Sequence, residues 1–260
     1  MIGETKSGYR NTLIAFTLYA IIFVLLMVQS NFVSRTSLIV LYLVIIAFVY
    51  GLRKREFMPL KWGKPTLFGV FFGSIMISAI FLVNLQIGWT KILDVSSKPA
   101  MFFVGAMILQ ALVSIGEELS FRELILRNFM IEMNATSAIA ISSIMFAVIH
   151  IPSILKQGME IEYNIIMIIT LALNGVLFAM LYIKYGLYAS IGFHFAWNFL
   201  QYNVFALKAG FSSLLELSYQ GSHIFNGGQY GPEAGLIGIL SMSLGIVAVA
   251  WFKRSQDKTN

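Results

Sequence analysis

The stretch MFFVGAMILQALVSIGEELSFRELILR, residues 101–127, decides the fold and marks a candidate site. Residues 101–115 are almost entirely apolar, whereas residues 116–127 carry three glutamates and two arginines. The apolar run, extended by the apolar residues between the charges, is long enough for a membrane-spanning helix. Ionisable side chains on such a helix are costly in a bilayer and therefore indicate a functional site. We expect one membrane helix over 100–126 with chemistry at its charged end.

The composition excludes a soluble globular protein. Of the 260 residues, 58% are hydrophobic and 12% are charged, whereas soluble domains have roughly 25% charged residues. The mean hydropathy is +0.80, and apolar runs recur along the whole chain. The sequence therefore predicts an all-α, polytopic membrane protein with about eight transmembrane helices and only short loops. The expected spans are 12–33, 37–52, 66–88, 100–126, 136–151, 164–183, 186–206 and 235–252.

Lysine and arginine are distributed unevenly between the alternate loops of this arrangement. Thirteen lie on one side and five on the other. Because cytoplasmic loops retain positive charge, both termini are expected in the cytoplasm. The apolar run from Leu13 to Val28 follows Lys6 and Arg10, as in a signal peptide, but no small-residue cleavage site follows it. We interpret this run as an uncleaved first span.

The expected organisation is one membrane core with short flanking segments. Residues 1–64 hold two N-terminal helices, residues 65–252 form the core, and residues 253–260 form a basic cytoplasmic tail. In the core, Gly69 and Gly73 have the GxxxG spacing that lets two membrane helices approach closely.

Cysteine content and charge limit the chemistry further. The chain has no cysteine, which excludes disulfides, thiolate metal ligands and cysteine nucleophiles. Its net charge is +6, but it has no basic tract long enough to bind nucleic acid, so the lipid bilayer is the expected partner. The longest polar loop, residues 209–233, is rich in glycine near its end and predicts turns.

Two acid–base pairs are expected on the fourth helix. Glu118 and Arg122 are four residues apart, as are Glu123 and Arg127, and the acid comes first in both pairs. This order and spacing favour ion pairs on a helix. Glu117 has no arginine at this spacing, so it is either a helix-end carboxylate in the headgroup region or a group with a chemical role.

Two of the three histidines lie inside apolar spans. His150 ends the motif FAVIH, and His194 begins the motif HFAWN, in which Asn198 projects from the same helix face. At about 1.5 Å per residue, Glu117, His150 and His194 lie ~15, ~16 and ~12 Å from one membrane face. We expect them to converge on one buried level. If the fourth span ended at Ile115 instead, the glutamates would lie near the cytoplasmic surface, away from the fifth helix.

These residue types suit a hydrolytic site. Glu117 can take a proton from water as a general base, while His150 holds and orients that water. His194 and Asn198 can donate hydrogen bonds to the oxyanion that develops when water attacks a carbonyl group. As an alternative, Glu117, His150 and His194 can bind zinc, which would itself activate the water. The HExxH helix of the common zinc proteases is absent from the sequence.

Three motifs, taken together and in this order, resemble the CPBP family of intramembrane proteases. They are EELSFR at 117–122, FAVIH at 146–150 and HFAWN at 194–198. This family includes the type II CAAX prenyl endopeptidases and the Abi bacteriocin-immunity proteins. Its pattern is EExxxR, FxxxH and HxxxN or HxxxB on successive membrane helices. GGQYGPEAG resembles a glycine-rich segment of bacterial members, except that Ala234 replaces a glycine of many members. The resemblance covers roughly residues 65–252.

The resemblance implies that the protein is an enzyme, an intramembrane endopeptidase. Its catalytic residues would be Glu117 and His150, which activate water, and His194 and Asn198, which form the oxyanion site. Glu118 and Arg122 match the family's supporting positions, and we interpret them as structural or orienting. No cofactor is favoured, and zinc is the alternative. The expected partners are the bilayer, a hydrophobic or lipidated peptide or protein substrate, and possible membrane-protein partners. The expected location is a bacterial cell membrane.

Two other functions fit parts of the sequence. A proton-coupled transporter also uses buried glutamate, arginine and histidine, but the inverted repeat of many transporters is not found in the sequence. A non-catalytic membrane scaffold or bacteriocin-immunity-type protein of the same fold would keep the helices without hydrolysis. The complete set of candidate catalytic residues argues against lost catalysis.

Overall fold

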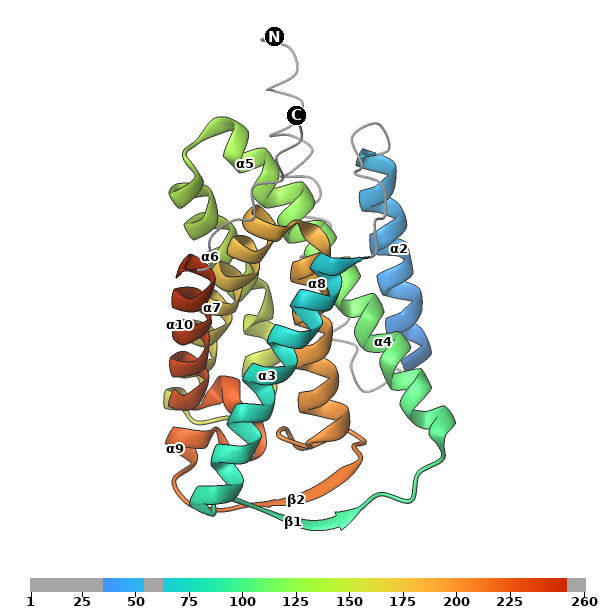
Figure 1. Cartoon of the computed structure of the whole chain (residues 1–260), viewed down its shortest axis with the longest axis vertical. Coiled ribbons are helices and arrows are strands. Elements are labelled where there is room, and N and C mark those ends of the chain that lie inside the picture. The colour runs from blue at the N-terminus through green and yellow to red at the C-terminus, as the bar shows by residue number, and fades with distance from the viewer. Residues whose placement is uncertain (1–34, 54–62, 252–260) are drawn as a thin grey trace.

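The computed structural model describes residues 35–53 and 63–251 of the chain. These residues form a mostly helical bundle whose longer helices run roughly along the long axis of the molecule (Figure 1). The expected first span, residues 12–33, and the expected basic tail, residues 253–260, lie outside the described residues, as does the run that resembles a signal peptide.

Most of the expected spans within the described residues correspond to a helix. The helices are α2 (Arg35–Arg53), α3 (Lys64–Ile87), α4 (Ala100–Glu118), α5 (Arg127–Glu132), α6 (Ala135–Leu155), α7 (Ile161–Tyr185), α8 (Leu187–Phe199) and α10 (Leu236–Trp251). The remaining helical segments are the π-helical η1 (Leu119–Leu126) and η2 (Leu200–Val204), and the short α9 (His223–Asn226), η3 (Gly228–Tyr230) and η4 (Pro232–Ala234). Through η1, the fourth helix continues past Ile115 without a break.

Among residues 35–53 and 63–251, four helices are long and apolar enough to cross a membrane, which supports an integral membrane protein. They are Lys64–Ile87, Ala100–Glu132, Ala135–Leu155 and Ile161–Tyr185. Two further apolar helices, Leu38–Gly51 and Leu236–Trp251, are shorter. The total of eight spans, the cytoplasmic placement of both termini and the domain boundaries stay predictions.

A small β-ribbon departs from the all-helical expectation. Strands β1 (Thr90–Val95) and β2 (Leu215–Tyr219) pair antiparallel, with Ile92 opposite Leu217. They lie together with α9 at one end of the bundle, opposite α5 (Figure 1). Both strands are short and lie in the connections between membrane helices. A search for apolar spans does not detect strands that pair in such connections. The prediction of helices alone was therefore incomplete.

Helices α3 and α8 approach each other closely through glycines. A Cβ atom on Gly69 would collide with the carbonyl oxygen of Ala189, and one on Gly73 would lie 2.7 Å from the carbonyl oxygen of Phe193. On α8, a Cβ atom on Gly192 would come within 2.5 Å of the backbone of α3. This packing confirms the close approach predicted from the GxxxG spacing, and it fixes the position of α8, which carries two of the candidate catalytic residues.

Replacing Gly69 by alanine should destabilise the fold, because the added methyl group meets the backbone of α8 and cannot be accommodated by a side-chain rotation. We expect a loss of about 1–3 kcal/mol, the usual cost of overpacking. Gly105→Ala is the matched control, since a Cβ atom on Gly105 of α4 meets nothing within 4 Å. Unfolding of both variants in detergent micelles, followed by circular dichroism, checks this. Equal stability of the two variants would contradict it.

Candidate active site

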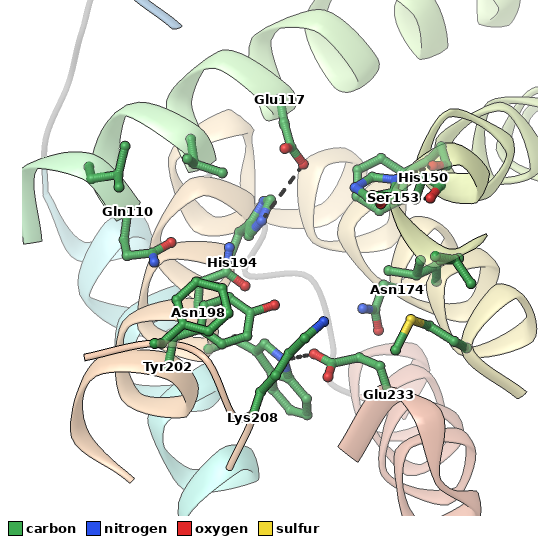
Figure 2. A pocket seen from close by; sticks show the side chains of 18 of the residues that line it. Gln110, Glu117, His150, Ser153, Asn174, His194, Asn198, Tyr202, Lys208 and Glu233 are labelled. Carbon is green, nitrogen blue, oxygen red and sulfur yellow. Dashed lines mark hydrogen bonds and ion pairs between the residues drawn. The ribbon is translucent and has the colours of Figure 1, made fainter. Parts of the chain in front are cut away.

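A cavity of about 270 Å³ lies between the helices and contains the candidate site. All four candidate catalytic residues line it: Glu117 from α4, His150 from α6, and His194 and Asn198 from α8 (Figure 2). The structure thus brings together, from three separate helices, the residues that the depth argument placed at one level. The supporting residues Glu118 and Arg122 lie behind this surface and are fully buried.

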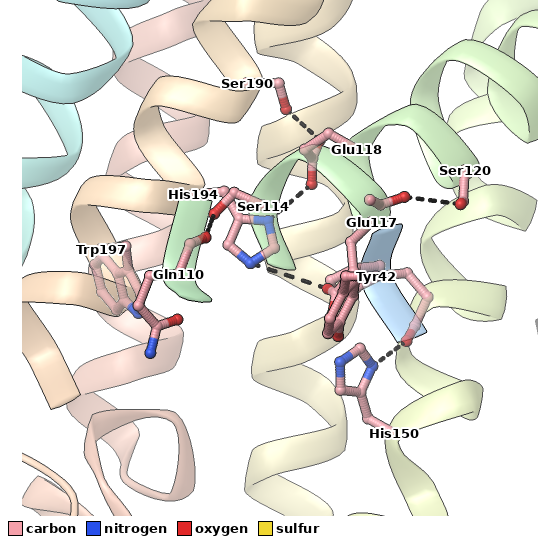
Figure 3. A network of polar contacts seen from close by, with 12 residues as sticks. Tyr42, Gln110, Ser114, Glu117, Glu118, Ser120, His150, Ser190, His194 and Trp197 are labelled. Carbon is pink, nitrogen blue, oxygen red and sulfur yellow. Dashed lines mark hydrogen bonds and ion pairs between the residues drawn. The ribbon is translucent and has the colours of Figure 1, made fainter. Parts of the chain in front are cut away.

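Glu118 is the centre of the buried polar network (Figure 3). Nε of Arg122 donates to Oε2 of Glu118 at 3.1 Å, and the hydroxyl group of Ser190 donates to the same oxygen. Nδ1 of His194 lies 3.0 Å from the other oxygen, Oε1. A buried carboxylate is tolerated only when its charge is paired and its oxygens are hydrogen-bonded. These three contacts meet both conditions.

The guanidinium group of Arg122 lies among aromatic rings. It is 5.1 Å from the ring centroid of Phe146 and 5.5 Å from that of Phe178. Its two terminal nitrogens have no hydrogen-bond partner among the described residues, so attraction to the ring faces compensates part of their lost hydration. The second predicted pair is also present, because Arg127 forms an ion pair with Glu123. Both acid–base pairs predicted from the four-residue spacing are therefore confirmed.

Glu118 also fixes the orientation of the His194 ring. A carboxylate oxygen accepts hydrogen bonds and cannot donate them, so Nδ1 of His194 carries the hydrogen. The opposite nitrogen, Nε2, then faces the cavity side of the network and lies 3.9 Å from Oε2 of Glu117. Phe178 stacks on the imidazole, with ring centroids 4.9 Å apart. His194 thus connects the buried ion pair to the carboxylate in the cavity.

Glu117 has a hydrogen-bond partner that the sequence motifs do not include. The phenol group of Tyr42, on α2, donates to Oε1 of Glu117 at 2.9 Å. Gly116 allows this approach, because a Cβ atom at that position would lie 2.7 Å from the Tyr42 ring. The motif search did not single out Tyr42, since one tyrosine in an apolar span is common and nothing nearby in the sequence marks it. Only the packing of α2 on α4 reveals the contact.

The FxxxH motif has a local physical explanation. Nδ1 of His150 lies 2.6 Å from the carbonyl oxygen of Phe146, one helical turn earlier. Because that oxygen can only accept, Nδ1 carries the hydrogen, and in a neutral imidazole Nε2 is then an acceptor. The Phe146 ring contacts the imidazole, with centroids 4.8 Å apart, and is itself packed edge-on against Phe121. The motif therefore fixes both the ring position and the tautomer of His150.

Asn198 follows His194 by one turn of α8, on the same helix face. Its side chain is half-buried at the cavity wall. Within residues 35–53 and 63–251, its carboxamide forms no hydrogen bond with another residue. Its two N–H donors can therefore serve a molecule bound in the cavity.

The cavity also holds charged residues that the sequence analysis missed. Glu233, in η4, accepts hydrogen bonds from Nε1 of Trp197 at 2.8 Å and from Nε2 of Gln201 at 2.6 Å. Lys208 lines the cavity beside it. Burial lowers the pKa of Lys208, and the charge of Glu233 opposes this shift in part. Glu233 belongs to the quoted stretch GGQYGPEAG, but its distance in sequence from the motifs gave no reason to place it in the same cavity.

The arrangement of donors does not favour the zinc alternative. Among the residues that the structure describes, no group of three His, Cys, Asp or Glu side chains is arranged to hold a metal ion. That statement includes the set Glu117, His150 and His194. The oxygen acceptors at Nδ1 of both histidines do not decide the matter, because zinc-ligating histidines show the same contacts. We therefore derive no step through a metal.

These features define a class of protein: a helical membrane protein with glutamate, histidine and asparagine side chains gathered on one buried cavity. The family model described as type II CAAX prenyl endopeptidase Rce1-like matches residues 96–200 of the chain. This segment contains all three motifs, and the match confirms the family resemblance. No curated protein and no solved structure matches the chain. The match favours a membrane-bound protease, a CAAX protease-like hydrolase.

Arg122→Met should be strongly destabilising, because it leaves the Glu118 carboxylate buried without its cation. We expect a loss of about 3–5 kcal/mol, as when one partner of a buried ion pair is removed. The double variant Glu118→Gln/Arg122→Met removes both charges and should recover part of that loss. Arg127→Met is the control. Its side chain is 36% exposed, so we expect a loss of about 1 kcal/mol or less. Denaturation in micelles measures all three, and a double variant no more stable than Arg122→Met would contradict the expectation.

Proposed function

We propose that this protein is an intramembrane endopeptidase that hydrolyses a peptide bond of a hydrophobic or lipidated peptide or protein in a bacterial cell membrane. One observation carries the proposal: Glu117, His150, His194 and Asn198 line a single cavity between apolar helices. The family match over residues 96–200 supports a hydrolase of this kind. The roles of the individual residues are inferred from their geometry.

The first step is the activation of water at Glu117 and His150. Glu117 takes a proton from the water as its oxygen attacks the carbonyl carbon of the scissile bond. His150 accepts a hydrogen bond through Nε2 and so holds the water in position, since its other nitrogen is bound to the Phe146 carbonyl oxygen. The hydrogen bond from Tyr42 to Oε1 fixes the carboxylate and leaves Oε2 on the side of His194.

The second step is stabilisation of the tetrahedral intermediate. His194 and Asn198 donate hydrogen bonds to the oxygen that gains negative charge. His194 donates through Nε2 in the form in which both ring nitrogens carry hydrogen, with Nδ1 bound to the Glu118 carboxylate. The C–N bond then breaks, and the proton held by Glu117 passes to the leaving nitrogen. The products are a carboxylic acid and an amine, and the acid gives its proton to the amine to leave a carboxylate and an ammonium.

The surroundings of the cavity support a substrate that is already in the membrane. Three of the helices that line it, α4, α6 and α7, belong to spans that are long and apolar enough to lie in the hydrocarbon region. The described loops are short or folded against the bundle, and none forms a separate soluble domain among residues 35–53 and 63–251. A hydrophobic or lipidated chain therefore reaches the cavity most directly from the bilayer.

Glu117→Gln should abolish cleavage of hydrophobic or lipidated peptides by the purified protein in lipid. Loss of a general base lowers the rate by roughly 10²- to 10⁴-fold, and loss of one oxyanion donor in Asn198→Ala lowers it by roughly 10²- to 10³-fold. Cleavage rates from mass spectrometry of the products measure both effects.

Glu132→Gln is the matched control for these variants. Glu132 is a glutamate on the same continuous helix, but it is exposed and does not line the cavity. Its substitution should leave the rate unchanged. Wild-type cleavage by Glu117→Gln would exclude the proposed mechanism, whereas a Glu117→Gln variant that cleaves nothing yet restores the phenotype of a deletion strain would favour a scaffold.

Metal removal gives an independent test of the mechanism. Because every proposed step uses protein side chains and water, cleavage should survive dialysis against a strong chelator with less than a twofold change in rate. Peptide cleavage before and after chelation, and after addition of zinc to the treated protein, measures this. Loss of activity that zinc restores would replace the carboxylate mechanism by a metalloprotease mechanism.

A further inference from the structure

The cavity has a second polar end that the proposed hydrolysis does not use. Lys208, Glu233 and Tyr202 line it, and in Figure 2 they lie across the cavity from Glu117. All three follow residue 200, where the family match ends. Nothing in the motifs assigns them a role, although they share the space in which the substrate would be cleaved.

The glycine-rich stretch GGQYGPEAG builds this end of the cavity. Gly231 has a φ of 93°, and a Cβ atom there would lie 3.1 Å from Nε2 of Gln201 and 3.2 Å from both Oε2 of Glu233 and Cβ of Lys208. A side chain at this position would push these groups apart, so glycine is required for the close approach. Both oxygens of Glu233 accept a hydrogen bond, one from Gln201 and one from Trp197.

The backbone around Lys208 is held in a specific conformation. Ala206 has a φ of 52°, which is uncommon for an alanine and persists only where the surroundings enforce it. Tyr219 enforces it by donating a hydrogen bond to the carbonyl oxygen of Ala206 at 2.7 Å. Burial raises the pKa of Tyr219 to about 12, so the phenol remains a donor. The amides of Leu207 and Ala209 each donate to a backbone carbonyl at 2.9 Å.

The ammonium group of Lys208 has no bonded partner at this site. It forms no hydrogen bond or ion pair with any residue in the described part of the chain. An ammonium removed from water is tolerated when an acceptor, preferably an anion, meets it. Glu233 lies beyond hydrogen-bond distance of this ammonium and acts on it only through its charge, so a molecule bound in the cavity can supply the acceptor.

We propose that Lys208 is a specificity-determining residue that binds a carboxylate group of the substrate. This inference rests on the proposed function, since it assigns the part of the peptide that lies across the cavity from Glu117. The carboxylate comes either from the C-terminus of the peptide or from an acidic side chain, because both offer the same pair of acceptor oxygens. Tyr202, stacked on Phe211 with centroids 4.4 Å apart, supplies an aromatic wall beside it.

The test compares peptides that differ only in a carboxylate. One hydrophobic peptide is prepared as the C-terminal acid, as the C-terminal amide, and as amides with Glu or Gln at an internal position. The full-length protein in lipid cleaves each form, and kcat and KM are measured for the wild type, Lys208→Met and Lys208→Arg. Lys91→Met is the control, because Lys91 is exposed on β1 and does not line the cavity.

We expect the wild type to favour a carboxylate-bearing peptide by about 10- to 100-fold in kcat/KM, mainly through KM. A preference for the acid over the amide identifies a C-terminal carboxylate, and a preference for Glu over Gln identifies a side chain. Lys208→Met should lose the preference, Lys208→Arg should keep most of it, and Lys91→Met should not change it. The preference is a ratio from one preparation, so partial unfolding of a variant does not affect it.

Two results would overturn the role of Lys208 while leaving the proposed function intact. They are equal cleavage of all peptide forms by the wild type, and an unchanged preference in Lys208→Met. Cleavage of no form by a folded wild-type protein would instead overturn the proposed function, and the assignment of Lys208 with it. The two failures are therefore distinguishable.

Discussion

The ionised carboxylate of Glu118 is the constraint on which the site depends. A charge in the interior of an apolar bundle must be compensated by the protein itself. Arg122 supplies the opposite charge, Ser190 supplies a hydroxyl group, and His194 completes the set. Arg122 lies one turn after Glu118 on the same continuous helix, whereas Ser190 and His194 lie on α8. The hydrogen bonds of this one carboxylate therefore fix the position of α8 relative to the helix that carries Glu118.

This constraint explains why two adjacent glutamates behave differently. Glu118 is turned inward and is fully occupied by its partners, so its oxygens are not accessible to substrate. Glu117 projects to the cavity and receives its hydrogen bond from Tyr42. The same helix thus provides one carboxylate that positions His194 and one that can react. The glycines of α3 hold α8 against the bundle so that this arrangement keeps its geometry.

Local spacing in the sequence was sufficient for part of the structure. Residues four apart on a helix must face the same side, which is why both ion pairs and the shared face of His194 and Asn198 could be predicted. The apolar runs located the long helices, and the GxxxG spacing located the close contact of α3 with α8. The prediction that Glu117 and His150 converge needed only the rise per residue of a helix and the assumption that the spans lie side by side.

The remaining features depend on contacts between segments far apart in the chain. Tyr42 is recognisable only after α2 packs on α4, and Glu233 only after the last loop folds back against α8. Lys208 reaches the cavity through the unusual backbone of Ala206, which no local pattern predicts. The β-ribbon also depends on contacts between distant segments, since most of the core sequence lies between its two strands. Tertiary packing, rather than local propensity, determines each of these.

The unbroken helix from Ala100 to Glu132 has a further consequence for the setting of the site. With 33 residues and a rise of about 1.5 Å per residue, it is roughly 50 Å long, whereas the hydrocarbon layer is about 30 Å thick. Such a mismatch is relieved by tilting the helix or by deforming the lipid around it. Glu117 lies near the middle of this helix, so it stays close to the midplane when the helix tilts about its centre. Lipid chain length should therefore alter the tilt of the helix more than the depth of the carboxylate.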